Sequence, residues 1–88
     1  VLYNERLELG AYVAFDTANL PCLLEWKNLK SHDYVLALEP CNNGGRNRAE
    51  ALADGTAAVL PAYSSVENRL ELGVLDGLGE IRAFLKNL

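Results

Sequence analysis

Glu39 is the residue of this sequence best placed to move a proton. It ends the apolar run of residues 34–38 and is followed directly by a proline. In an extended chain Val35, Ala37 and Glu39 share one face, and the two small neighbours leave room for a ligand beside the carboxylate. Both faces of the run are apolar up to Glu39, which predicts a strand covered on both sides. Partial desolvation would suit a group that must take and return a proton. The alternative, which the pattern taken alone favours, is an ordinary strand-end acid that reaches solvent.

The loop after Glu39 holds two further polar candidates. Arg46 carries a fork of donors in a glycine-bearing loop, where it could bind a hydroxyl or an anionic group of a small ligand. Asn42 could donate a hydrogen bond to the same ligand. The alternatives are a solvated loop arginine and plain turn chemistry, of which the run Asn-Asn-Gly-Gly is typical.

Trp26 and His32 are the other side chains with an evident capacity for binding or chemistry. The phase of its strand places Trp26 with apolar residues, so we expect it to pack in the core and not to serve as a stacking platform. Glu25 and Lys27 flank it on the other face, and we expect them to form an exposed cross-strand charge pair. His32 lies in a short polar turn, and we expect it to face solvent.

The length and composition bound what this chain can do alone. A chain of 88 residues buries only roughly 60% of the surface that its unfolded form exposes, so a deep cleft is hard to build within it. Its first residues already have the pattern of a strand, so we expect residues 1–88 to be a single segment, the carboxy-terminal part of something larger. The isolated segment is then expected to associate with the rest of its parent chain, or with itself through exposed sheet edges.

Charge and cysteine content exclude several classes of partner. The net charge is −4 and the basic residues are scattered, which argues against nucleic acid. No apolar run approaches the ~20 residues of a membrane span, and we expect a cytoplasmic protein. Cys22 and Cys41 lack the spacing of a metal or redox motif, so both are expected to be small buried hydrophobic residues. We expect no metal and no cofactor.

The pattern of residues predicts an all-β, mainly antiparallel fold with a short terminal helix. Closely spaced strand candidates joined by short polar turns indicate a meander, and hence a sandwich or a large sheet. These strands are expected at residues 11–15, 22–29, 34–39 and 56–61. Between the last two, residues 46–54 favour either a short helix stopped by Gly55 or a long ordered loop.

In the last third of the sequence, the spacing of apolar residues changes from that of a strand to that of a helix. Residues 64–75 alternate and predict a strand whose charged side, with Glu67, Arg69 and Glu71, is wet. Residues 76–88 show helical spacing of apolar residues and predict an amphipathic helix, capped by Asp76 and with Lys86 near its end. The alternative is a strand broken by two glycines. The pentapeptide RLELG occurs at residues 6–10 and 69–73, and we interpret both copies as an amphipathic strand stopped by glycine.

Several short motifs of the chain resemble one family in the expected order. The chain is similar to the carboxy-terminal part of the aldose 1-epimerase (galactose mutarotase) superfamily, above all to its bacterial branch of aldose-epimerase-like proteins of unassigned substrate. The resemblance implies a very large antiparallel β-sandwich, to which this chain would supply closing strands, and a sugar-binding cleft on one sheet. The motifs that carry it are Asn19-Leu20-Pro21, Glu25-Trp26-Lys27, residues 34–42, Gly45-Arg46 and residues 72–77.

The resemblance also implies a mechanism in which Glu39 is the general base. In mutarotases this glutamate takes the proton from the anomeric hydroxyl while a histidine protonates the ring oxygen. The ring then opens, rotates about the first carbon–carbon bond and closes to the other anomer. The family's histidine lies upstream, and His32 does not match it, so the isolated 88 residues are expected to be inactive. Two alternatives remain: a non-catalytic carbohydrate-binding β-sandwich, and a structural domain whose acid is incidental.

Overall fold

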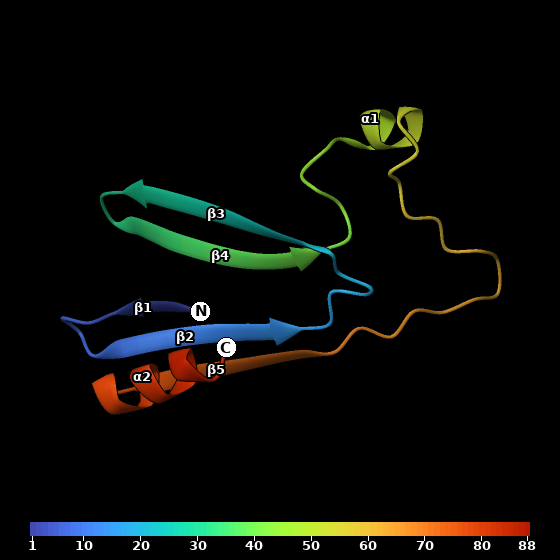
Figure 1. The fold of residues 1–88 in the computed structure, drawn as a ribbon. Coiled ribbons are helices and arrows are strands. Elements are labelled where there is room, and N and C mark those ends of the chain that lie inside the picture. The colour runs from blue at the N-terminus through green and yellow to red at the C-terminus, as the bar shows by residue number, and fades with distance from the viewer. The chain divides into compact units, whose positions relative to one another are not determined.

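The computed structural model describes all of residues 1–88, which form five strands and two helices (Figure 1). The strands lie in two antiparallel arrangements, a three-stranded sheet with the order β1-β2-β5 and a two-stranded hairpin of β3 and β4. The chain divides into one unit made of Val1–Ala14 and Leu70–Leu88, and a second made of Phe15–Arg69. The predicted all-β antiparallel fold with a short terminal helix is confirmed.

The hairpin of the second unit carries the residues of most interest. Strand β3 (Cys22–Lys30) pairs with β4 (Asp33–Cys41) in one continuous register, from Cys22 opposite Cys41 to Lys30 opposite Asp33. Both predicted strands are confirmed, and β4 continues past its predicted end. Directly paired residues point to the same side of a sheet, so the register decides which side chains of the two strands share a face.

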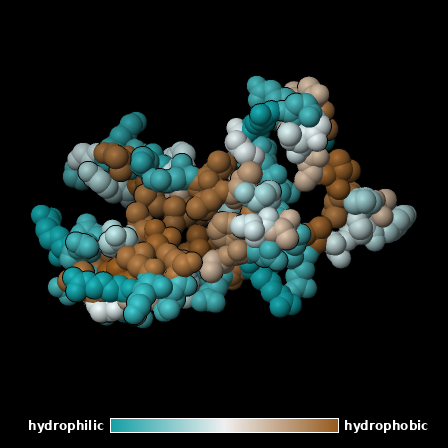
Figure 2. All heavy atoms as spheres, in the orientation of Figure 1, coloured by the Kyte–Doolittle hydropathy of each residue, from teal (hydrophilic) through white to brown (hydrophobic).

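The prediction that the strand of Glu39 is covered on both sides is wrong for this structure. Tyr34 is 77% exposed and Val35, on the opposite face, is 49% exposed. The physical reason is that residues 15–69 contain no second sheet, which a two-stranded hairpin needs in order to bury a face. Figure 2 shows hydrophobic residues, in brown, at the surface of the chain in this view.

The short helix of the second unit is well defined by its own sequence. Helix α1 (Arg48–Ala53) starts at Asn47, whose side chain accepts from the Glu50 N–H at 3.0 Å, while the Glu50 carboxylate accepts from the Asn47 N–H at 3.3 Å. This reciprocal capping box fixes the start of the helix. Gly55 follows the end of the helix with a φ of 75°, so the helix prediction is confirmed and the loop alternative is not.

Residues 56–69 contain no strand. The predicted strand at 56–61 and the first half of the strand predicted at 64–75 are therefore wrong. Residues 56–61 favour β structure and residues 64–69 alternate between apolar and polar side chains, but no neighbouring strand pairs with either stretch. Val59 is 78% exposed. An alternating pattern without a partner strand does not form a ladder.

The first unit is a three-stranded sheet with a helix on one face. The strands β1 (Leu2–Asn4), β2 (Leu9–Phe15) and β5 (Leu70–Asp76) are followed by helix α2 (Leu78–Lys86). Ile81 of α2 and Leu75 of β5 are buried, and the rings of Phe84 and Tyr12 stack with their centroids 4.5 Å apart. These contacts form the small core of this unit.

Two details of this unit differ from the predictions. Asp76 ends β5 and does not cap α2; the helix starts at Gly77 without a side-chain cap, and the Glu80 carboxylate accepts from the Asp76 N–H at 2.8 Å. Glu71 points to the face that α2 covers, where it accepts from Tyr12, whereas Leu72 on the other face is 77% exposed. The predicted position of Lys86 in the last helical turn is confirmed.

Candidate functional site

The structure places Glu39 on an open face of the β3–β4 hairpin. It is exposed, it lies directly opposite Leu24, and it follows Ala37 on the same face. The three ion pairs of the structure involve other residues, so no cation neutralises its carboxylate. An exposed carboxylate without a cationic partner is free to accept a proton from a ligand.

Trp26 lies on the same face as Glu39. It pairs directly with Ala37, which makes it the diagonal cross-strand neighbour of Glu39, and it is 53% exposed. Diagonal neighbours on one face lie about 7–8 Å apart, within reach of an aromatic side chain. The prediction that Trp26 packs in the core is therefore wrong. The phase of its strand was assigned correctly, but only the register of β3 on β4 shows that this face also carries Glu39.

The loop after β4 folds back over one end of this face. A Cβ added to Gly45 would lie 3.7 Å from Leu24 Cδ2, and one added to Gly44 would lie 3.9 Å from Cys22 Sγ. Within the loop, the Asn43 side chain accepts from the Arg46 N–H at 3.0 Å and donates to the Arg46 carbonyl at 2.9 Å. The loop is thus held by its own hydrogen bonds against the side of the hairpin on which Glu39 lies.

Arg46 and Asn42 come together, but apart from Glu39. They line a cavity of about 290 Å³ with Cys22, Gly44 and Thr56, among others, and Glu39 is not part of its lining. The Arg46 guanidinium forms an ion pair with Asp54 at the end of α1. Its charge is therefore shared with an acid of the chain itself, which weakens its capacity to bind an anionic ligand.

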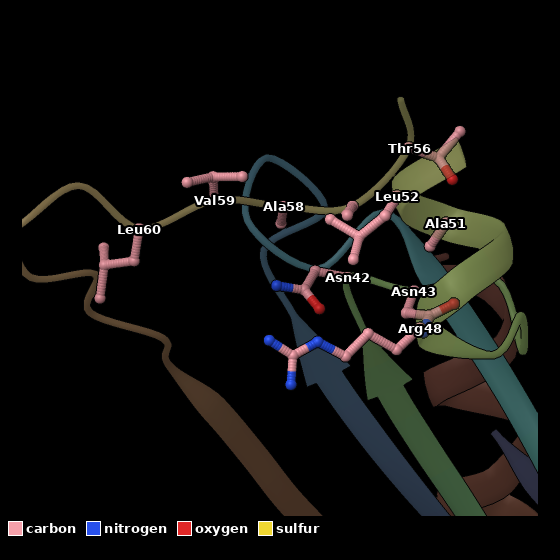
Figure 3. Close-up of a pocket in the computed structure, with 10 residues that line it drawn as sticks. Asn42, Asn43, Arg48, Ala51, Leu52, Thr56, Ala58, Val59 and Leu60 are labelled. Atoms are coloured by element: carbon pink, nitrogen blue, oxygen red, sulfur yellow. The ribbon is translucent and has the colours of Figure 1, made fainter. Parts of the chain in front are cut away.

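A second, larger cavity is lined by Arg48, which the sequence pattern does not mark as a candidate binding residue. Its volume is about 460 Å³, and it lies between the loop, helix α1 and residues 56–60 (Figure 3). Arg48 and Asn42 supply polar groups to its lining, and Arg48 takes part in no ion pair. The only feature of the sequence that could have pointed to Arg48 is its position at the start of a short helix, and that position by itself indicates no binding role.

His32 lies at the far end of the hairpin from Glu39. It is exposed in the turn between β3 and β4, with a φ of 70°. The prediction of a solvent-facing turn residue is confirmed, and within these residues Glu39 has no histidine beside it. Glu25 and Lys27 form the predicted exposed charge pair, with 3.0 Å between the carboxylate and the ammonium, on the face opposite Glu39. The pair lies within β3, so the prediction that it would be a cross-strand pair is wrong.

The two cysteines are half-buried, free, and directly opposite each other at the end of the hairpin. Cys41 Sγ donates to the Asn43 carbonyl at 2.9 Å, so this thiol helps to hold the loop. No group of three or more histidine, cysteine or acidic side chains comes together to hold a metal ion.

Together these features define a mainly antiparallel β protein with a carboxylate and an exposed tryptophan on one face of a hairpin. Residues 1–74 match the family model described as a domain of unknown function, DUF4432, and the chain belongs to this family. No curated protein and no solved structure matches the chain. Neither of its helices is long and apolar enough to cross a membrane.

Proposed function

We propose that this chain is part of an aldose 1-epimerase-like isomerase that interconverts the anomers of a sugar, with Glu39 as its general base. The observation that carries the proposal is the position of Glu39, exposed and without a cationic partner, on an open face beside Trp26. The resemblance of residues 34–42 and their surroundings to mutarotases supports the same assignment. The proposal includes a cytoplasmic location for the protein.

In the proposed mechanism Glu39 accepts one proton from the sugar and later returns it. Its carboxylate takes the proton from the anomeric hydroxyl while a histidine from outside these 88 residues protonates the ring oxygen. The bond between the anomeric carbon and the ring oxygen breaks, which leaves an open-chain aldehyde. After rotation about the first carbon–carbon bond the ring closes on the other side, and both protons return, so acid and base are regenerated.

A second candidate function is sugar binding without catalysis. The cavity lined by Asn42 and Arg48 supplies amide and guanidinium donors away from Glu39, as a binding module would require. In that case Asn42 and Arg48 would bind a polar or anionic substituent of the sugar, and Glu39 would have no role.

Magnetisation-exchange NMR between the α and β anomeric protons of several aldoses tests the proposal. It should be carried out with the full-length protein that contains these residues. Accelerated exchange with at least one aldose is the expected result. Saturable line broadening without accelerated exchange would replace the proposal with the binding module, and the absence of both effects would reject both functions.

A further inference from the structure

We infer that Trp26 is the platform on which the pyranose ring of the substrate stacks, and that it positions the anomeric hydroxyl at Glu39. This inference rests on the proposed function and adds the binding mode of its substrate. Its basis is the juxtaposition, on one face of the β3–β4 hairpin, of an exposed indole and an exposed carboxylate.

The register sets the spacing between the two groups. Trp26 is paired with Ala37, and Glu39 is the next residue of β4 on that face, so the two side chains are diagonal neighbours. With about 7–8 Å between their backbone positions, the indole and the carboxylate can both reach a ligand that lies in the space between them. The methyl group of Ala37, next to both, is too small to fill that space.

The side chains around the two groups restrict where a ligand can lie. Leu24, the direct partner of Glu39, is approached by the backbone of the loop at Gly45. That end of the face is therefore occupied, whereas the Trp26 side is open. A ring bound beside Glu39 extends toward the indole, because the loop closes the other direction.

The chemistry of the indole selects the class of ligand. Trp26 as a residue is 53% exposed, and a large apolar ring gains free energy when a flat apolar surface covers it. A pyranose offers such a surface where its C–H bonds lie on one side of the ring, while its hydroxyls point outward to polar partners. The inferred ligand is therefore an aldose in its closed pyranose form.

Tyr34 provides a matched control within the same hairpin. It is another highly exposed aromatic residue, but it pairs with Leu29 and lies on the face opposite Glu39. If exposure of an aromatic ring were sufficient for sugar binding, Tyr34 and Trp26 would behave alike. The inference requires that only Trp26 affects the substrate.

The test compares Trp26→Ala, Trp26→Phe and Tyr34→Ala in the full-length protein, with the dependence of anomer exchange on aldose concentration as the readout. Trp26→Ala is expected to raise KM by about tenfold and to change kcat less. Trp26→Phe, which keeps an aromatic face, is expected to restore most of the affinity, and Tyr34→Ala to leave both constants unchanged. An unchanged KM in Trp26→Ala would overturn the inference while the proposed function stands.

Tryptophan fluorescence gives an independent readout that does not need catalysis. Trp26 is the one tryptophan of this sequence. Subtracting the fluorescence of Trp26→Phe from that of the wild type removes the signal of any other tryptophan in the full-length protein. Saturating aldose, or a 1,5-anhydro sugar that cannot open its ring, is expected to shift this difference signal in the wild type and equally in Tyr34→Ala. Such a shift without accelerated exchange would reject the isomerase and keep the platform. Accelerated anomer exchange without any fluorescence shift would reject Trp26 as the platform. This outcome does not depend on whether Trp26→Ala folds.

Discussion

Tyr12 and Gly73 lie in direct contact on neighbouring strands of the three-stranded sheet. A Cβ added to Gly73 would overlap the Tyr12 ring, and the same ring stacks on Phe84 of α2. Glycine is thus required here by the close approach of a side chain, and not by its backbone conformation. Because the ring joins the sheet to the helix, this contact holds the small core of the first unit together.

Replacement of Gly73 by alanine is expected to destabilise the protein by about 1–3 kcal/mol, because the added methyl group must displace the Tyr12 ring. Gly79→Ala is the matched control. Gly79 lies in α2 with no atom within 4 Å of an added Cβ, so alanine should stabilise the helix by about 0.5–1 kcal/mol. Free energies of unfolding from urea titrations of the full-length protein measure both. Equal effects of the two substitutions would show that the Tyr12 contact is not close.

The hydrogen bond between Tyr12 and Glu71 predicts a dependence of stability on alkaline pH. The Tyr12 hydroxyl donates to Glu71 Oε1 at 2.5 Å, and this bond raises the pKa of Tyr12 above 10.0, with smaller contributions from desolvation and from the charges of Glu71 and Glu80. A raised pKa in the folded state means that the unfolded chain loses this proton first. The contribution to stability is therefore complete below pH 10 and is lost as the pH rises through the folded-state pKa.

Tyr12→Phe tests this dependence, since it keeps the ring and removes the hydroxyl. The variant should be less stable than the wild type at neutral pH, and the difference in melting temperature should shrink above pH 10. Melting curves of both proteins between pH 7 and the alkaline limit of reversible folding measure it. A difference that stays constant across that range would contradict a role for the hydroxyl bond.

The opposed cysteines predict a disulfide on oxidation. Directly paired residues of antiparallel strands have Cα atoms about 4.5–5.5 Å apart, which lies within the range that a disulfide spans. Oxidised glutathione should convert the Cys22 and Cys41 thiols to one intrachain bond and release two molecules of reduced glutathione. Intact mass should show the loss of two hydrogens and no alkylatable thiol. Cys22→Ser should instead carry one glutathione, and two alkylatable thiols in the treated wild type would refute the pairing.

The exposed apolar faces predict that the isolated 88-residue chain associates with itself. One face of the three-stranded sheet leaves Leu72 and Val74 mostly exposed, and the hairpin is open on both faces. Exposed strand edges beside such faces can pair with another copy. Sedimentation velocity over a wide concentration range should show a rising mean mass. A monomer at all concentrations, with a sharp and reversible melt, would favour an independently folding module.

The strands and helices that local patterning could predict are those with clear boundary signals. The hairpin follows from two apolar runs around a short polar turn, and α1 from a capping box and Gly55. Residues 56–69 were predicted wrongly because strand formation depends on a partner, which a local pattern does not contain. The two RLELG copies show the same limit: residues 5–8 form a turn, residues 70–73 lie within β5, and neither glycine ends a strand.

The site could be predicted only in part for a related reason. Glu39 can be predicted from the sequence as a candidate because it is an acid at the end of an apolar run, and that pattern lies within a single strand. The role of Trp26 depends on the register of β3 on β4, and a shift of one residue would have placed it on the other face from Glu39. The pairing of Arg46 with Asp54 likewise depends on the path of the loop, which no spacing rule describes.

The most direct test of the proposed role of Glu39 compares Glu39→Gln with Glu25→Gln by magnetisation-exchange NMR. Both residues are exposed acids of the same hairpin, but Glu25 lies on the face opposite Glu39. Glu39→Gln should lower the protein-dependent rate of anomer exchange by about 10²–10⁴-fold, because the amide cannot accept the proton, whereas Glu25→Gln should keep the wild-type rate. A Glu39→Gln protein that exchanges anomers as fast as the wild type would show that Glu39 is an ordinary strand-end acid.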